Sequence, residues 1–381
     1  MYKGYSCIDS DSHVLEPADL WEKYLDPEFR DAAPRSHVGY WGEPYAYQID
    51  CTVSALSMPT FLAGRPAPMP GLKDVYGDHQ DLGFSPEVYE RVLDRTGIDY
   101  MVVYPTIGLF ATSVEDLSAA TAAAYRRAYN RWLHDFVSAG DGRLIGAASI
   151  DLRDPEEAAR EARRCVVEYG FRAVTVTPNP VTQYPWFHEF HDPLWAELQE
   201  LDVPLAIHAG AGTPTDVGRL HFGDWAAGRG VGAFSMGNML QCMALIGGGV
   251  LERFPRLRVA HLEVGCGWVP YILDRMQSGI QGSNRASSRY LPMEGLRQPP
   301  VDYFRRQCFA ACDPDDPHLA WVIAEVGDGC IVTATDFGHP EGRGYANALD
   351  EILAIDSISD ETRRRIMWDN AARLYGIERA D

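Results

Sequence analysis

Short apolar runs alternate along this chain with stretches in which apolar residues recur at helical spacing. Eight of the runs are rich in β-branched residues and nearly continuous in apolar character, which is typical of strands buried on both faces. They cover residues 5–14, 99–106, 143–151, 172–178, 203–210, 257–263, 305–312 and 328–336. Helical sequence follows most of them, at 113–140, 154–170, 191–201, 237–253 and 270–277. Alternating strands and helices predict a parallel sheet, and eight such strands predict closure into a (β/α)8 TIM barrel.

The chain is longer than such a barrel requires. A (β/α)8 barrel takes about 250 residues, whereas this chain has 381. The surplus falls mostly at about 25–90, which is rich in Pro, Gly and Tyr, and at 212–236. Both segments follow predicted strands, so we expect them to be long loops on the C-terminal face, where substrates bind in this fold. We therefore expect one domain, a distorted barrel spanning residues 1–381.

Composition and charge exclude several classes of partner. The net charge of −20 and the pI of about 4.9 give a surface that repels phosphate backbones, so we expect no nucleic acid partner. No apolar run reaches about 18 residues, which argues against a membrane span. The eight cysteines form no CxxC pair and the N-terminus has no apolar segment, so we predict buried, reduced thiols and a cytoplasmic location.

Polar residues stand at the C-terminal ends of several predicted strands, where a buried strand has little use for charge. The first strand carries Asp9, Asp11 and His13, which project together because strand side chains alternate. The fifth strand ends in His208 and the eighth in Asp336. The first and eighth strands are neighbours in a closed barrel, and the fifth faces them across its mouth. Imidazoles and carboxylates converging in this way form a suitable cage for Zn²⁺ or Mn²⁺ with one position left open.

The sixth predicted strand adds two more groups of this kind. His261 and Glu263 are two residues apart at its end, so alternation predicts that both project from one face. They are candidates for acid–base chemistry beside the cation.

Taken in order, these segments resemble the amidohydrolase superfamily. More narrowly, the chain is similar to the "amidohydrolase 2" branch, which contains aminocarboxymuconate-semialdehyde decarboxylase and γ-resorcylate decarboxylase. The resemblance extends over nearly the whole chain and rests on an ordered set of segments: IDSDSHVLEP (8–17), LDRTGIDYMVVYPT (93–106), PLAIHAG (204–210), FPRLRVAHLEVGCGWVPYILDRM (254–276), TATDFGHPEG (333–342) and RIMWDNAARLYGI (365–377).

The resemblance implies roles for individual residues. It assigns Asp11, His13, His208 and Asp336 as ligands of the metal, and it gives Asp336 a second role in moving protons. Glu16 also fits the family pattern, as a ligand, as support for the ligands or as a helix cap. The resemblance further implies a homodimer.

Two departures from the family pattern affect the chemistry. Binuclear relatives use a carboxylated lysine at the end of the fourth strand, but this chain has no lysine beyond Lys73, so one metal ion is expected. The sixth-strand histidine of the decarboxylases aligns best with Glu263, which leaves open whether His261 has taken over its role. His339, three residues after Asp336, is a further candidate that either contacts substrate or shapes the loop.

Three functions remain open at this point. The leading hypothesis is a non-oxidative decarboxylase of a small carboxylated or phenolic molecule, in which the metal acts as a Lewis acid and Asp336 delivers a proton with help from His261 or Glu263. The alternative is a hydrolase that activates water for attack on an ester, lactone, amide or C–C diketone. A barrel that has lost catalysis and serves as a scaffold is the third, although an unpaired buried ligand cluster without a cation would be costly.

Overall fold

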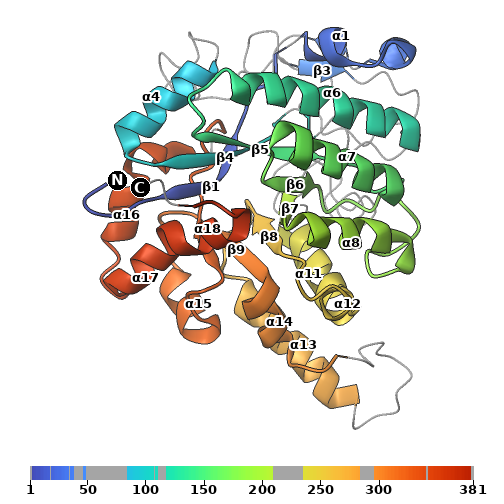
Figure 1. Cartoon of the computed structure of the whole chain (residues 1–381). Coiled ribbons are helices and arrows are strands. Elements are labelled where there is room, and N and C mark those ends of the chain that lie inside the picture. Colours follow the sequence, from blue (N-terminus) through green and yellow to red (C-terminus); the bar gives the residue numbers. More distant parts are fainter. Residues whose placement is uncertain are drawn as a thin grey trace.

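The computed structural model describes residues 2–17, 19–33, 35–37, 46–48, 84–106, 108–109, 117–208, 235–283, 296–339 and 342–378. Its centre is an eight-stranded parallel sheet in the order β1-β4-β5-β6-β7-β8-β9-β10 (Figure 1). The strands are β1 (Ile8–His13), β4 (Tyr100–Tyr104), β5 (Leu144–Ser149), β6 (Ala173–Val176), β7 (Leu205–His208), β8 (Val259–Leu262), β9 (Cys308–Cys312) and β10 (Ile331–Thr333). All eight lie within the predicted runs.

The barrel closes where the last strand returns to the first. A parallel bridge joins Ser12 to Phe337. The backbone N–H of His13 donates to the carbonyl of Phe337 at 2.6 Å, and the N–H of Asp336 donates to the carbonyl of Asp11 at 2.9 Å. The predicted (β/α)8 barrel is therefore confirmed.

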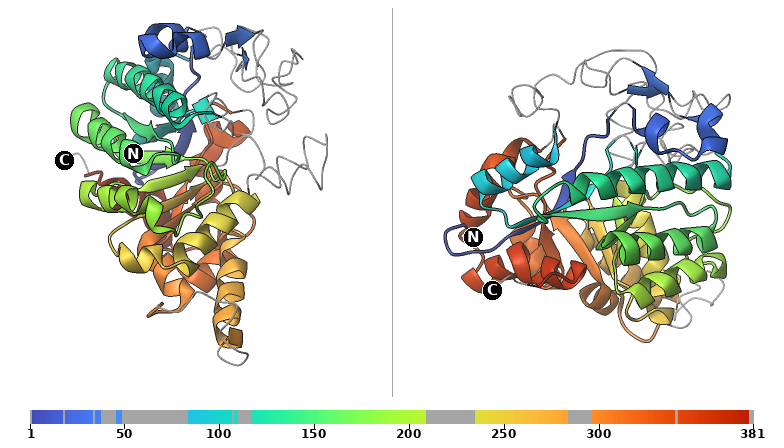
Figure 2. Two further views of the ribbon diagram at one scale, coloured as in Figure 1. Left: turned by 90° about the vertical axis from the view of Figure 1, so that its right-hand side faces the viewer. Right: turned by 45° about the horizontal axis from the view of Figure 1, so that its top comes forward.

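Helices surround the strands, as the views in Figure 2 show. They are α1 (Leu20–Tyr24), α4 (Pro86–Thr96), α6 (Ala119–Ser138), α7 (Pro155–Tyr169), α8 (Asp192–Leu201), α11 (Gly237–Gly247), α12 (Val250–Arg253), α13 (Val269–Ser283), α14 (Pro300–Gln307), α15 (Leu319–Val326), α16 (Ala348–Leu353), α17 (Asp360–Arg364) and α18 (Asn370–Tyr375). Helix α7 has a side-chain cap at its start and a glycine at its end: the Asp154 side chain accepts from the N–H of Glu157 at 3.0 Å, and Gly170 ends the helix with a φ of +72°.

Two predicted segments differ from the structure at their edges. The run at 305–312 is strand only from Cys308, because residues 305–307 form the last turn of α14, which begins at Pro300. The end of the predicted excursion at 25–90 belongs to α4. Within the excursion, β2 (Arg35–His37) pairs antiparallel with β3 (Ala46–Gln48), while residues 51–83 and the insertion at 212–234 lie outside the described residues.

Two apolar layers hold the barrel together. The inside combines larger side chains such as Tyr104, Leu262 and Phe309 with many alanines, namely Ala147, Ala173, Ala206, Ala260, Ala311 and Ala334. Trp368, Ala371, Leu374 and Tyr375 join this interior cluster, so α18 and the π-turn before it (Arg365–Asp369) close the barrel at the end opposite the ligand-bearing strand ends. A second, larger cluster fills the space between strands and outer helices.

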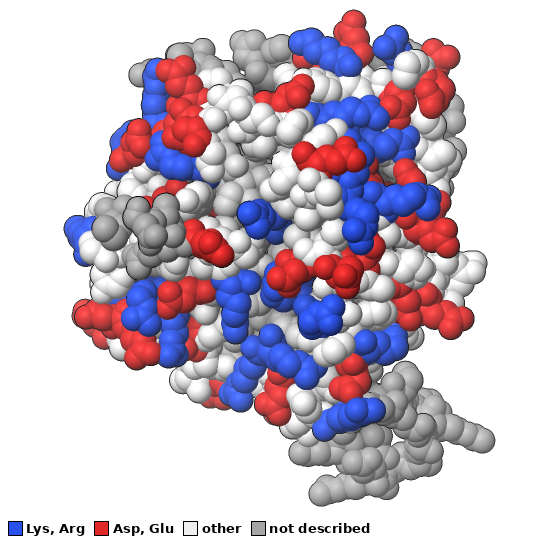
Figure 3. Space-filling view, viewed as in Figure 1, with Lys and Arg blue, Asp and Glu red and all other residues white. Residues whose placement is uncertain are grey.

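The surface carries mixed charge on the face seen in Figure 3, with acidic and basic side chains interleaved. Among the described residues, no helix has both the length and the apolar character that crossing a bilayer requires. The seven described cysteines are free and buried, as predicted, and Cys51 lies outside the described residues. The cytoplasmic location stays a prediction.

Candidate metal centre

An irregularity in β1 positions the first two candidate ligands. The register with β4 shifts between Asp9 and Ser12, which interrupts strict alternation. Asp11 and His13 lie at the mouth and are 1% and 0% exposed. Asp9, which was expected to project with them, instead accepts hydrogen bonds from Ser12 Oγ at 2.7 Å and from the N–H of Thr335 at 3.0 Å. It thus joins β1 to the segment after β10.

Three predicted ligands converge at this end of the barrel. His13 Nε2 lies 3.0 Å from His208 Nε2, and Asp11 Oδ1 is 3.3 Å from His208 Nε2 and 3.5 Å from His13 Nε2. Ligand atoms of the three side chains all lie within 4.8 Å of one another. Asp336 Oδ1 lies 3.3 Å from His13 Nε2, at the edge of the same group. The structure therefore brings together all four residues that were expected to surround the cation.

The donor set suits a cation because several of its atoms are otherwise unsatisfied. Neither carboxylate oxygen of Asp11 accepts a hydrogen bond from the described residues. His13 Nδ1 contacts the carbonyl of Pro105 at 3.0 Å, so Nδ1 carries the proton and Nε2 turns a bare lone pair toward His208. Burial, with His339 and His208 alongside, also holds the pKa of His13 well below its usual value. Buried lone pairs and a carboxylate facing one another are costly without a positive charge among them.

Backbone strain marks the ends of β8 and β10. Glu263 and Asp336 have φ values of +57° and +54°, in the left-handed region that L residues rarely adopt. Such strain is characteristic of functional sites, where it aims a side chain that regular strand geometry would send elsewhere. Glu263 Oε2 lies 3.5 Å from His208 Nδ1, so its side chain reaches the mouth.

His339 belongs to the cluster and does more than shape a loop. Its ring stacks on His13 with a centroid distance of 3.6 Å and an interplanar angle of 15°. Its Nδ1 lies 3.1 Å from Asp336 Oδ1 and 3.5 Å from Glu263 Oε1. The stack requires Gly338, which has a φ of +106° and where a Cβ would lie 2.6 Å from the carbonyl oxygen of His13.

Charge within the cluster changes the proton affinity of its members. Burial raises the pKa of the Asp336 carboxyl well above its usual value, against the opposing pull of His339. Burial lowers the pKa of His339, but the Asp336 and Glu263 carboxylates outweigh it and hold this pKa well above its usual value. The pair can therefore hold and pass a proton at the mouth.

The expectation that His261 and Glu263 share a face is wrong. Alternation holds through Leu262, which lies in the interior cluster, and the left-handed conformation of Glu263 then turns its side chain back toward the mouth. His261 points into the helix layer, where Nδ1 lies 3.0 Å from Asn238 Oδ1 and the ring packs against Trp268 and Phe304. Burial lowers its pKa to about 3, so the ring stays neutral. The geometry thus gives no support to an acid–base role for His261.

One residue at the mouth escaped the sequence analysis. Asp313 directly follows β9, the seventh strand of the barrel. Its side chain stays exposed to solvent, but partial desolvation by the surrounding protein raises its pKa to about 6, and the neighbouring charges of Asp316 and Asp11 act in the same direction. The rule that identified the other candidates, a charged residue at a strand end, would have found it too.

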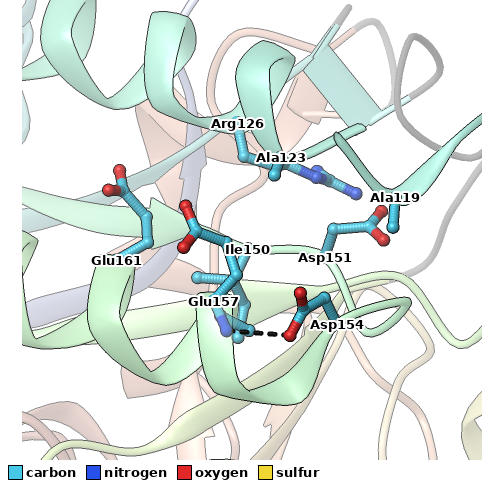
Figure 4. Close-up of a pocket in the computed structure, with 9 residues that line it drawn as sticks. Ala119, Ala123, Arg126, Ile150, Asp151, Asp154, Glu157 and Glu161 are labelled. Atoms are coloured by element: carbon cyan, nitrogen blue, oxygen red, sulfur yellow. Dashed lines mark hydrogen bonds between the residues drawn. The ribbon is translucent and has the colours of Figure 1, made fainter. Parts of the chain in front are cut away.

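A small cavity elsewhere is not the candidate site. It lies between α6 and α7, and its lining includes Arg126, Asp151 and Glu157 (Figure 4). Its volume of about 10 Å³ matches a single water molecule and not a substrate. Burial lowers the pKa of Arg126 to about 10, and the guanidinium donates to Ser149 Oγ at 2.5 Å. These side chains connect the helices to the end of β5.

Comparison with known proteins agrees with the resemblance read from the sequence. A γ-resorcylate decarboxylase of Polaromonas sp. strain JS666 is 28% identical over 299 residues, covering 76% of this chain and 86% of the relative. A 2-amino-3-carboxymuconate-6-semialdehyde decarboxylase of Dictyostelium discoideum is 22% identical and covers 77% of each chain.

The fold has a counterpart among solved structures. The structure of 5-carboxyvanillate decarboxylase from Novosphingobium aromaticivorans matches this fold with a TM-score of 0.71 at 23% identity. That enzyme was complexed with manganese and 4-hydroxy-3-methoxy-5-nitrobenzoic acid. The match covers 98% of this chain and 97% of that one. The model of the family described as amidohydrolase matches residues 8–377. The chain therefore belongs to the amidohydrolase family.

Proposed function

We propose that this protein is a metal-dependent decarboxylase that acts on a small carboxylated, phenolic substrate. The observation that carries the proposal is the meeting of His13 Nε2 and His208 Nε2 at 3.0 Å, beside the Asp11 carboxylate, which accepts no hydrogen bond from the described residues. The relatives described above, which are decarboxylases, support the choice of reaction. The hydrolase and scaffold hypotheses have no such support, and the experiment described below is designed to detect either of them.

Asp11, His13, His208 and Asp336 would hold one divalent cation. Two imidazoles and two carboxylates suit Zn²⁺ and Mn²⁺ alike, and the manganese in the related solved structure favours Mn²⁺. When bound, the cation supplies a Lewis acid for a substrate carboxylate or an adjacent hydroxyl.

The protein's own residues would manage the proton. Decarboxylation breaks the bond between ring carbon and carboxylate, releases CO₂ and places a proton on that carbon. Asp336 suits this delivery by its position, because its Oδ1 lies 3.3 Å from His13 Nε2 in the ligand group and 3.1 Å from His339 Nδ1. His339 Nδ1 lies between the Asp336 and Glu263 carboxylates and can restore the proton. The sequence did not decide whether Glu263 or His261 has the acid–base role, and we assign it to Glu263.

The test is to measure product chemistry on a matched panel of substrates. Purified protein loaded with Mn²⁺ is incubated with hydroxybenzoates that carry a carboxylate beside the hydroxyl, and separately with aryl esters and lactones. We expect one CO₂ released per phenol formed, and no turnover after removal of the metal by a chelator. Hydrolysis of an ester or lactone without release of CO₂ from any acid would overturn the proposal in favour of the hydrolase.

We also propose that two copies of the chain pair in solution. Met236, directly before α11, and Leu240 and Met243 on this helix form an apolar stripe and are 43%, 49% and 41% exposed. Contiguous exposed apolar side chains are typical of protein interfaces. Light scattering should give twice the chain mass of 42.4 kDa, and a mass of one chain at micromolar concentration would contradict the dimer.

A further inference from the structure

A buried carboxylate lies behind two imidazoles of the cluster. Glu16, on the segment that leaves β1, is 1% exposed. We propose that Glu16 is a positioning residue that orients His13 and His339 through the backbone after β4. The inference rests on the proposed function, because the two rings are oriented toward the cation and its acid–base pair.

Glu16 holds the segment after β4 with a single oxygen. Its Oε1 accepts from the N–H of Thr106 at 3.1 Å and from the N–H of Gly108 at 2.9 Å. The approach is close, since a Cβ at position 108 would lie 3.0 Å from the same oxygen. Hydrogen bonds from backbone N–H groups to a carboxylate are among the stronger ones in proteins. Pro105, Thr106 and Gly108, called here the post-β4 segment, are thereby fixed relative to β1.

The post-β4 segment in turn sets the orientation of His13. The carbonyl of Pro105 accepts from His13 Nδ1 at 3.0 Å. This bond keeps the proton on Nδ1 and leaves Nε2 bare at 3.0 Å from His208 Nε2. Partners of this kind determine the tautomer and ring orientation of metal-binding histidines. A shift of Pro105 would therefore turn the ring away from Asp11 and His208.

The next residue of the segment contacts the second imidazole. Thr106 Oγ1 lies 3.1 Å from His339 Nε2, on the ring edge opposite the Asp336 and Glu263 carboxylates. The His339 ring also stacks on His13. Both rings therefore depend on the post-β4 segment, which the Glu16 carboxylate holds through the N–H groups of Thr106 and Gly108. Glu16 is thus placed to orient the ring of His13, a proposed metal ligand, together with the ring of His339, a member of the proposed acid–base pair.

Two substitutions distinguish this role from direct ligation of the cation. In Glu16→Gln, the amide retains a carbonyl oxygen at the position of Oε1, where it can accept both N–H bonds. In Glu16→Asp, the carboxylate remains but is one methylene shorter and cannot reach both donors. A metal ligand would show the opposite preference, because an amide oxygen binds Zn²⁺ or Mn²⁺ far less well than a carboxylate does.

The experiment measures cation affinity by competition with a chelator for wild type and both variants. It also records ¹⁵N spectra of histidine-labelled, metal-free protein, with the His13 signals assigned by their loss in His13→Gln. We expect Glu16→Gln to keep an affinity close to wild type and the Nδ1–H tautomer of His13. We expect Glu16→Asp to weaken affinity by about 10- to 100-fold and to change that tautomer signal. Equal behaviour of the two variants, or weaker binding by Glu16→Gln than by Glu16→Asp, would overturn the inference.

The nearly isosteric substitution Thr106→Val provides a second test, because it removes the hydroxyl that contacts His339. It should shift the ¹⁵N signals of His339 in metal-free protein and leave the His13 tautomer unchanged, and unchanged His339 signals would contradict the inference. If wild type bound no cation, the proposed function would fail, whereas the spectra of metal-free protein would still decide the role of Glu16.

Discussion

Replacing Asp336 by asparagine is expected to lower kcat for CO₂ release by about 10²- to 10⁴-fold, the range typical of a lost general acid. Asparagine keeps the size of the side chain but cannot donate a carboxylic proton. It also removes the charge that raises the pKa of His339, so that ring loses its proton at a lower pH. Initial rates with saturating substrate and Mn²⁺ measure the effect.

A matched control separates this effect from general damage. Asp302→Asn changes an exposed carboxylate on α14 that makes only a 3.9 Å ion pair with Arg305 among the described residues, and it should leave kcat unchanged. A rate for Asp336→Asn within about threefold of this control, far smaller than the loss of a general acid produces, would show that the proton is delivered by another group.

Replacing His208 by alanine is expected to weaken Mn²⁺ binding by at least about 100-fold, since a lost ligand should cost more than the 10- to 100-fold of a lost supporting residue. His208 is 0% exposed and its Nε2 faces both His13 and Asp11, so alanine removes one of the two imidazole ligands of the cation. Metal analysis after gel filtration and titration of metal-free protein with Mn²⁺ provide the readouts.

His134→Ala is the control for this variant, because His134 stacks on Tyr169 on the outer helices. It should bind Mn²⁺ as wild type does. Undiminished Mn²⁺ binding by His208→Ala would exclude this histidine from the site.

The sequence predicted the barrel well because its strands are buried on both faces and so form unbroken apolar runs. Closure of the sheet into a barrel follows from the number of strands. A charged residue at the end of such an apolar run has few structural uses, so it stands out as a candidate functional residue. Asp11, His13, His208 and Asp336 could be identified in this way. Their convergence follows from the fold, since the ends of parallel strands meet at one face of the barrel.

What escaped prediction depends on local departures from regular geometry. Alternation predicted a shared face for His261 and Glu263, but the φ of +57° at Glu263 separates them. The register shift in β1 likewise directs Asp9 toward Thr335 and away from the mouth. The stack of His339 on His13 requires a left-handed Gly338. Such conformations are set by contacts between distant segments, which periodicity along one strand does not encode.

The central claim is that one cation lies among Asp11, His13, His208 and Asp336. The structure offers a competing group, because ligand atoms of His13, Glu263 and His339 also lie within 4.8 Å of one another. Anomalous diffraction at the manganese edge, from crystals of Mn²⁺-loaded protein, distinguishes the two directly. We predict one peak per chain, bound by Asp11, His13, His208 and Asp336. A peak bound by Glu263 and His339, or two peaks per chain, would contradict the claim.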